Sequence, residues 1–152
     1  MNTETSLQLR PLRPDDLEKV VEIDGRITGH TRRQFFEKRL EAVLADNKGF
    51  VTMALEDSHG APVGYAIARI LDGEFGTTQK IALLDVIGID PGYHNSGYGT
   101  KLLNGLTEYL KNHDIHEIDT EVDWSDHEIM QFFKSTGFEP APVLVLERNL
   151  TN

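Results

Sequence analysis

Three glycines, Gly92, Gly97 and Gly99, directly follow an apolar run from Ile81 to Ile89. Glycine adopts positive φ without strain, so a glycine-rich turn lets successive backbone amides point at one anion. The leucine-rich segment after the turn predicts a helix, whose amino terminus adds a positive partial charge. The order of strand, glycine-rich turn and helix is typical of a phosphate-binding site, and equally of a turn that binds no ligand.

The glycine spacing excludes two common nucleotide-binding loops. Gly92 and Gly97 fit GxxxxG, but Tyr98 and Gly99 stand where a P-loop requires Lys and then Ser or Thr. Thr100 and the two residues after it do not complete the GxGxxG pattern of a dinucleotide-binding fold. If this turn binds a phosphate, it is therefore a phosphate-binding loop of another protein class.

Asp85 is the only charged residue inside the apolar run. A carboxylate in a buried strand is suited to accept a proton during catalysis. It could equally bind a cationic substrate, or form hydrogen bonds that anchor a neighbouring loop. The sequence leaves these three roles open.

The hydrophobic periodicity predicts an alternation of strands and helices. We expect strands at residues 7–12, 50–56, 63–71, 81–89, 117–122 and 143–150. We expect helices at residues 14–23, 31–46, 97–112 and 126–136, with a break at 24–29. This order predicts an α/β fold (an α+β mixed sheet) in a single domain, 1–152, whose central sheet has about six to seven strands and helices on both faces.

Composition narrows the class of partner. The chain has 25 acidic and 15 basic side chains, a formal charge of −10, which argues against nucleic-acid binding. Neither a signal peptide nor a membrane-spanning run is evident, and the absence of cysteine fits a cytoplasmic protein. His113 and His116 lack a third ligand nearby, so we expect no metal site. A homodimer is compatible with the sequence.

Two motifs carry a family resemblance. The run His94-Asn95-Ser96-Gly97-Tyr98-Gly99 resembles the acyl-CoA pyrophosphate loop, Gln/Arg-x-x-Gly-x-Gly/Ala, of the GNAT superfamily of N-acetyltransferases, with His94 replacing Gln or Arg. The segment from Asp126 to Phe138 resembles the superfamily's closing motif, Asn-x-x-Ala-x-x-Phe-Tyr-x-x-x-Gly-Phe, with Phe133 replacing Tyr. The two motifs occur in the order found in that superfamily.

The resemblance implies that acetyl-CoA is the cofactor and that its pantetheine arm pairs with the central strand. The backbone amide of Ile87 would polarise the thioester carbonyl, and a bulge at Gly88 would help to open the strand. The implied cofactor-binding residues are Ile87, Gly88, Ile89, His94, Asn95, Ser96, Gly97, Tyr98, Gly99, Thr100, Asp126, Phe132 and Phe133.

The resemblance further implies acetyl transfer to a primary amine of a small molecule or peptide, by direct attack in a ternary complex. The catalytic Glu common in the superfamily is missing, which leaves Asp85 as the candidate base beside the Ile87 amide. Acceptor-binding candidates are Glu121, Asp123, Trp124 and Arg32. Because Phe133 cannot protonate the departing thiolate, the alternative function is a catalytically weak acyl-CoA-binding regulatory module.

Overall fold

The computed structural model describes residues 7–76 and 78–151. The chain divides into two compact units, Met1–Glu121 and Val122–Asn152. The first contains β1 (Gln8–Arg10), α1 (Leu17–Thr28), α2 (Arg33–Ala45), β2 (Phe50–Glu56), β3 (Pro62–Asp72), β4 (Lys80–Ile89), α3 (Tyr98–Lys111) and β5 (Ile118–Thr120), with 3-10 turns at Pro14–Asp16, Glu74–Gly76 and Pro91–Tyr93. The second contains α4 (His127–Ser135).

The strands of the first unit form one mixed sheet in the order β1-β2-β3-β4-β5. The pairs from β1 to β4 are antiparallel, whereas β4 and β5 are parallel. The predicted mixed sheet is confirmed, but the predicted count of six to seven strands is wrong, because five occur in the described ranges.

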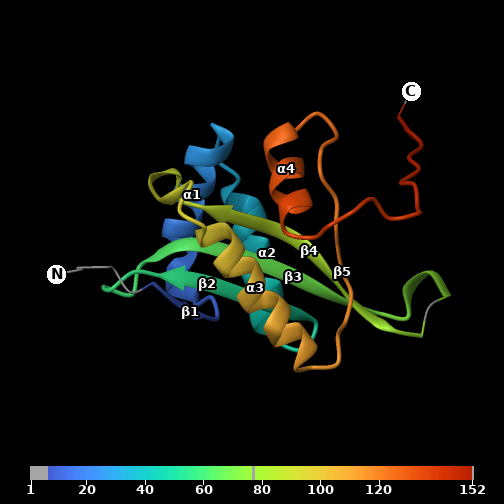
Figure 1. Cartoon of the computed structure of the whole chain (residues 1–152), viewed down its shortest axis with the longest axis horizontal. Coiled ribbons are helices and arrows are strands. Elements are labelled where there is room, and N and C mark those ends of the chain that lie inside the picture. Colours follow the sequence, from blue (N-terminus) through green and yellow to red (C-terminus); the bar gives the residue numbers. More distant parts are fainter. Residues whose placement is uncertain (1–6, 77, 152) are drawn as a thin grey trace. The chain divides into compact units, whose positions relative to one another are not determined.

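Helices cover both faces of the sheet (Figure 1). Neighbouring residues of a strand point to opposite faces. A Cβ added at Gly64 would meet Leu102 of α3. The ring of the next residue, Tyr65, packs edge-on against Phe36 of α2, with centroids 5.7 Å apart. The sheet therefore separates α3 from α1 and α2, as the alternation of elements predicted.

Each layer has its own apolar core. Between the sheet and α1 and α2, the buried cluster comprises Val20, Val21, Ile23, Phe36 and Tyr65. On the other face α3 buries four leucines at helical spacing, Leu102, Leu103, Leu106 and Leu110. Burial of a leucine side chain stabilises the fold by about 2 kcal/mol, so this stripe fixes α3 and the turn that precedes it.

Two predictions of secondary structure are wrong, one for the end of α1 and one for a strand near the end of the sequence. The expected break at residues 24–29 is helix as far as Thr28, where α1 ends, and the capping residue Gly29 has a φ of +82°. The expected strand at 143–150 does not form: its leucines Leu144 and Leu146 are each 87% exposed. This run has strand-forming residues but pairs with no strand among the described residues, and propensity alone does not make a strand.

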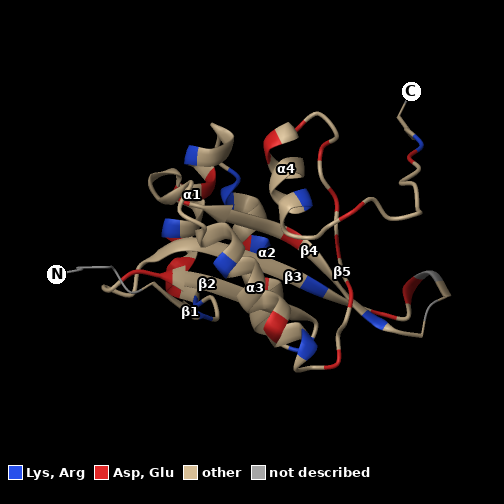
Figure 2. Cartoon of the chain, viewed as in Figure 1, with Lys and Arg blue, Asp and Glu red and all other residues tan. Residues whose placement is uncertain are grey.

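Charged residues are spread over the helices and strands of the first unit and over α4 of the second (Figure 2). None of the described helices is long and apolar enough to cross a bilayer. Within residues 7–76 and 78–151, no group of three His, Asp or Glu side chains is placed to hold a metal ion.

Candidate functional site

Strands β4 and β5 part after Leu84. They pair only where Ala82, Leu83 and Leu84 face Ile118–Thr120. The hydroxyl of Thr120 donates to the Leu84 carbonyl at 3.0 Å at the end of this pairing. Beyond Leu84, the β5 side of β4 pairs with no strand in the described part of the chain. The second half of β4 therefore has a free backbone edge.

The backbones of Ile87 and Ile89 face this free edge. The Asp90 N–H donates to a β3 carbonyl at 2.8 Å, so Asp90 faces β3. Backbone groups alternate in direction along an antiparallel strand, so Gly88 also faces β3 while Ile87 and Ile89 face away. The His94 imidazole Nε2 lies 2.7 Å from the Ile89 carbonyl oxygen and occupies it. The backbone amides of Ile87 and Ile89 remain free to bind an extended ligand.

Asp85 is the extra residue of a β-bulge in β4. Val86 pairs with Ile67 and Leu84 pairs with Ala68, which leaves Asp85 without a partner in register. A bulge increases the local twist and bends the strand. The bulge thus coincides with the point at which β4 leaves β5.

The expected bulge at Gly88 is wrong, because Gly88 pairs in register with Tyr65. Its lack of a side chain has a different cause. An added Cβ would lie 2.6 Å from the Tyr65 hydroxyl and 3.1 Å from Cδ1 of Ile27. Gly88 therefore allows close packing of β4 on the tyrosine and on α1.

The glycine-rich turn presents a series of unused amides. Asn95 and Gly97 have φ values of 64° and 78°, and Gly97 is the residue that caps α3. No side chain caps this helix, and within the described residues the amides of residues 95–100 donate to no protein acceptor. Residues 94–97 and Thr100 are exposed, and Tyr98 and Gly99 are half-buried. The predicted turn thus has the donors that a pyrophosphate requires.

Asp85 lies between two arginines. Its Oδ2 is 3.5 Å from Nε of Arg39, on α2, and 3.8 Å from Nε of Arg69, on β3. Sequence reasoning missed both arginines. Arg69 could have been found, because it is the only charge within the apolar part of its strand, as Asp85 is in β4.

The guanidinium of Arg32 holds a buried carboxylate. Its Nε and Nη2 donate to Asp24 at 2.9 and 2.6 Å, and Asp24 is 2% exposed. The hydrogen bond to Asp24 raises the pKa of Arg32 further above its usual value. Its predicted acceptor-binding role stays a prediction, while the contact with Asp24 is structural.

The other acceptor candidates lie where the two units meet in sequence. Glu121, the last residue of the first unit, is exposed. In the second unit Trp124 is 88% exposed, and Asp123 Oδ1 accepts hydrogen bonds from the Ser125 hydroxyl and amide at 2.6 and 2.9 Å. These bonds lower the pKa of Asp123. That Glu121, Asp123 and Trp124 bind the acceptor stays a prediction.

The closing motif forms the short helix that the sequence predicted. Asp126 caps α4 by accepting from the Ile129 amide at 3.2 Å. Phe133 is buried, with its ring centroid 5.3 Å from Phe132 and 4.8 Å from Phe138. Phe133 therefore has an aromatic environment within the second unit and no hydroxyl.

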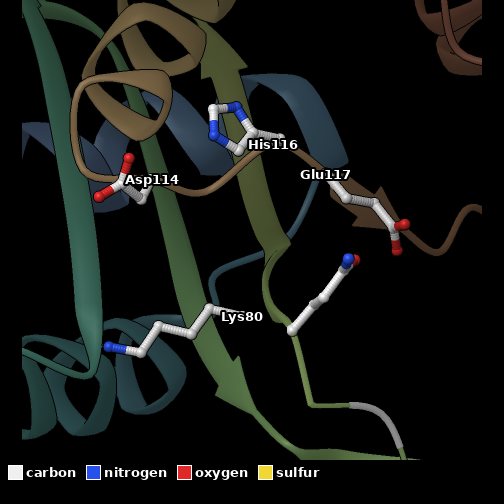
Figure 3. A pocket seen from close by; sticks show the side chains of 5 residues that line it. Lys80, Asp114, His116 and Glu117 are labelled. Atoms are coloured by element: carbon white, nitrogen blue, oxygen red, sulfur yellow. The ribbon is translucent and has the colours of Figure 1, made fainter.

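A pocket of about 300 Å³ lies at the opposite end of β4 from the glycine-rich turn. It is lined by Gln79, Lys80, Asp114, His116 and Glu117. Strands rise about 3.3 Å per residue, which places Lys80 roughly 30 Å from Ile89. Figure 3 shows the Lys80 and Glu117 side chains pointing in different directions. The pocket contains none of the predicted site residues.

Similarity to known proteins extends over both units. The acetyltransferase (GNAT) family model matches residues 9–138. An uncharacterized N-acetyltransferase of Methanocaldococcus jannaschii is 23% identical over 143 residues, covering 90% of this chain and 62% of that protein. The chain thus spans less than two thirds of that relative's length.

Solved structures share the fold. The aminoglycoside N-acetyltransferase AAC(6')-Iy, in complex with CoA, has a TM-score of 0.80 at 14% identity over 99% of each chain. The glucosamine-6-phosphate N-acetyltransferase of Arabidopsis thaliana has a TM-score of 0.73 at 16% identity, over 94% of this chain and 98% of its own. Because the family model matches most of the sequence, including the parting strands and the glycine-rich turn, this chain belongs to the GNAT family of acetyltransferases.

Proposed function

We propose that the protein transfers the acetyl group of acetyl-CoA to a primary amine of a small molecule or peptide. The observation that carries this proposal is the free edge of β4 leading directly into a turn with unused amides. An extended amide chain can pair with such an edge, and a pyrophosphate can accept from such a turn. The similar aminoglycoside and glucosamine-6-phosphate acetyltransferases both act on amines, as their names state.

The chain's residues divide the task of holding acetyl-CoA. Amides of residues 95–100 would bind the pyrophosphate, and the amide of Ile89 would pair with the pantetheine arm. The amide of Ile87, which faces the same edge, would donate to the thioester carbonyl, where negative charge develops. Acetyl-CoA supplies an activated acetyl group. The imidazole of His94 forms a hydrogen bond with the Ile89 carbonyl and so helps to fix the conformation of the turn.

The attacking amine must be neutral. Deprotonating a lysine-type amine at pH 7 costs about 4 to 5 kcal/mol, whereas an α-amine costs about 1. Asp85 lies on β4 two residues before Ile87 and is the proposed base for the more basic class of acceptor. Direct attack in a ternary complex requires no covalent enzyme intermediate, consistent with the absence of cysteine.

A catalytically weak acyl-CoA-binding module is the second candidate function. It is favoured by Phe133, which is buried against Phe132 and Phe138 and has no proton to give. A free thiol has a pKa near 8.5, so an unassisted thiolate can still leave at neutral pH. Loss of the acid should therefore slow acetyl transfer rather than abolish it.

Titration calorimetry with acetyl-CoA and with CoA tests the shared premise, because a lack of heat from both would contradict both functions. CoA release measured across polyamines, amino acids, aminoglycosides, sugar amines and peptides then separates the two. Acceptor-dependent release supports the transferase. Binding without release from any acceptor supports the module. Cell fractionation would test the predicted cytoplasmic location, and sedimentation would test whether the protein forms a homodimer.

A further inference from the structure

Two arginines and one aspartate converge on the sheet face that α1 and α2 cover. Arg39 comes from α2, Arg69 from β3 and Asp85 from the bulge in β4. Their formal charges sum to +1, in a chain whose formal charge is −10. A local positive excess in an acidic protein favours an anionic ligand.

Two donors and one acceptor of this cluster make no hydrogen bond. Nε of Arg39, Nε of Arg69 and Oδ2 of Asp85 are buried and have no hydrogen-bond partner. The 3.5 and 3.8 Å separations are ion pairs, too long for good hydrogen bonds. A buried donor without an acceptor costs about 1 to 3 kcal/mol. An acceptor that enters this site would recover that free energy.

Arg32 differs from these two arginines, because its side-chain N–H groups have hydrogen-bond acceptors. Arg32 donates twice to Asp24, at 2.9 and 2.6 Å. The side chains of Arg39 and Arg69 make no hydrogen bond with the residues that the structure describes. Each guanidinium carries five N–H donors in a planar fork that matches carboxylate and phosphate oxygens. The side-chain chemistry of the pair is therefore suited to binding an oxyanion.

The surrounding residues hold the two guanidiniums in place. The Arg39 guanidinium carbon lies 5.2 Å from the centroid of the Phe35 ring, which supports it from one side. Arg69 stands on a strand paired along both edges. Asp85 lies between the two cations and offsets their mutual repulsion. The side chains remain reachable, because they are 26% and 43% exposed.

The cluster also lies close to the proposed reaction centre. Asp85 and Ile87 are two residues apart on β4, which corresponds to about 7 Å along a strand. An acceptor that binds the arginines could thus place an amine near the Ile87 amide. A polycation without an anionic group would instead face two fixed positive charges.

We propose that Arg39 and Arg69 bind an oxyanion, a carboxylate or a phosphate ester, carried by the acceptor amine. This proposal rests on the proposed function, since it names the acceptor class of the same site. It assigns Asp85 a second task, which is to hold the two guanidiniums side by side.

The direct test is calorimetric titration of CoA-saturated protein with inorganic phosphate and with malonate, since saturation with CoA fills the glycine-rich turn. We expect saturable binding of at least one anion. Arg39→Gln and Arg69→Gln should each weaken it at least tenfold, and Arg39→Lys less than Arg39→Gln. Arg33→Gln is the matched control, because Arg33 lies on α2 and its ion pairs among the described residues are with Glu18 and Glu37. Thermal melting of each variant separates lost binding from lost folding.

Matched amines then distinguish the two sources of the anion. The pairs are β-alanine with β-alaninamide, phosphoethanolamine with ethanolamine, and glucosamine 6-phosphate with glucosamine. We expect the anionic member of a pair to have the higher kcat/KM, by at least tenfold, and Arg69→Gln to remove the preference. No saturable anion binding, or equal binding by the folded arginine variants, would overturn the proposal. Failure of CoA itself to bind would instead overturn the proposed function. In that case, titrating the CoA-free protein and its arginine variants with phosphate would still show whether Arg39 and Arg69 bind an anion.

Discussion

The hydroxyl of Tyr65 donates a hydrogen bond to Oδ1 of Asp24 at 3.3 Å, joining the middle of the sheet to α1. Arg32 holds both oxygens of the same carboxylate from the start of α2. Asp24 is 2% exposed, and burial of a carboxylate is costly unless it is paired and hydrogen-bonded. This buried carboxylate therefore ties α1 both to the sheet and to the start of α2.

Arg32→Ala should destabilise the fold, because it leaves the Asp24 carboxylate buried with one weak hydrogen bond. Loss of one partner of a buried pair is costly, and the partial exposure of Arg32 reduces the effect to about 2 to 3 kcal/mol. Arg33→Ala is the control, since its pair with Glu18 is exposed and its loss should leave stability unchanged. Urea unfolding measures both. Equal stability of the two variants would refute this account of Asp24.

Alkaline conditions should destabilise the protein through Tyr65. Burial, followed by the charge of Asp24, raises the pKa of Tyr65 far above its usual 10.0. The folded state therefore keeps the phenol proton at a pH where the unfolded state loses it. The stabilisation is complete below pH 10 and declines above it, by about 1.4 kcal/mol per pH unit for one group.

Tyr65→Phe tests this expectation. At pH 7 the variant should lose about 1 kcal/mol, the usual value of one hydrogen bond. Between pH 10 and 11 its free energy of unfolding should fall less steeply than that of the wild type. Parallel slopes for the two proteins would show that another group controls alkaline unfolding.

Local sequence patterns predicted the elements whose cause is local. The leucine spacing predicted α3, and Leu102, Leu106 and Leu110 are all buried as expected. The glycine run predicted the turn, and Gly97 has the positive φ that only glycine adopts without strain. A helix was predicted to begin at residue 126, and Asp126 caps α4.

Features that depend on distant partners were not predictable in this way. The bulge at Asp85 is a property of its register against β3, which one strand's sequence does not specify. Arg39 lies 46 positions before Asp85, and nothing in either local pattern joins them. The run at 143–150 has the composition of a strand, but the hydrogen bonds of a strand come from a neighbour.

Gly97→Val should weaken acetyl-CoA binding more than it weakens the fold. At φ +78° a side chain costs about 1 to 2 kcal/mol, and nothing lies within 4 Å of the added Cβ. The matched control is Gly76→Val, which has the same φ and equally open surroundings. Both variants should lose similar stability, while only the first should bind acetyl-CoA at least tenfold more weakly by calorimetry. Equal affinities would argue against the turn as the pyrophosphate site.

Gly88→Ala should act mainly on packing. The added Cβ would lie 2.7 Å from Cζ of Tyr65, so the ring must move. Overpacking of this kind costs about 1 to 3 kcal/mol. Because the two residues touch, the effects of Gly88→Ala and Tyr65→Leu should be non-additive, with the double variant more stable than the sum predicts. Additive losses in chemical denaturation would indicate that the contact is not responsible.

Asp85→Asn separates a base from a positioning residue. If Asp85 accepts the proton of the amine, turnover should fall strongly while acetyl-CoA affinity stays the same, since the residue lies on β4 before the bound region. The acidic limb of the pH–rate profile should also disappear or move, because protonation of Asp85 would no longer limit the rate at low pH. If Asp85 only holds Arg39 and Arg69, the variant should instead raise KM for an anionic acceptor and keep the wild-type pH profile. Stopped-time assays of CoA release from pH 5 to 9, with the melting temperature of the variant measured alongside, decide between the two. A folded variant with unchanged kinetics would exclude both roles.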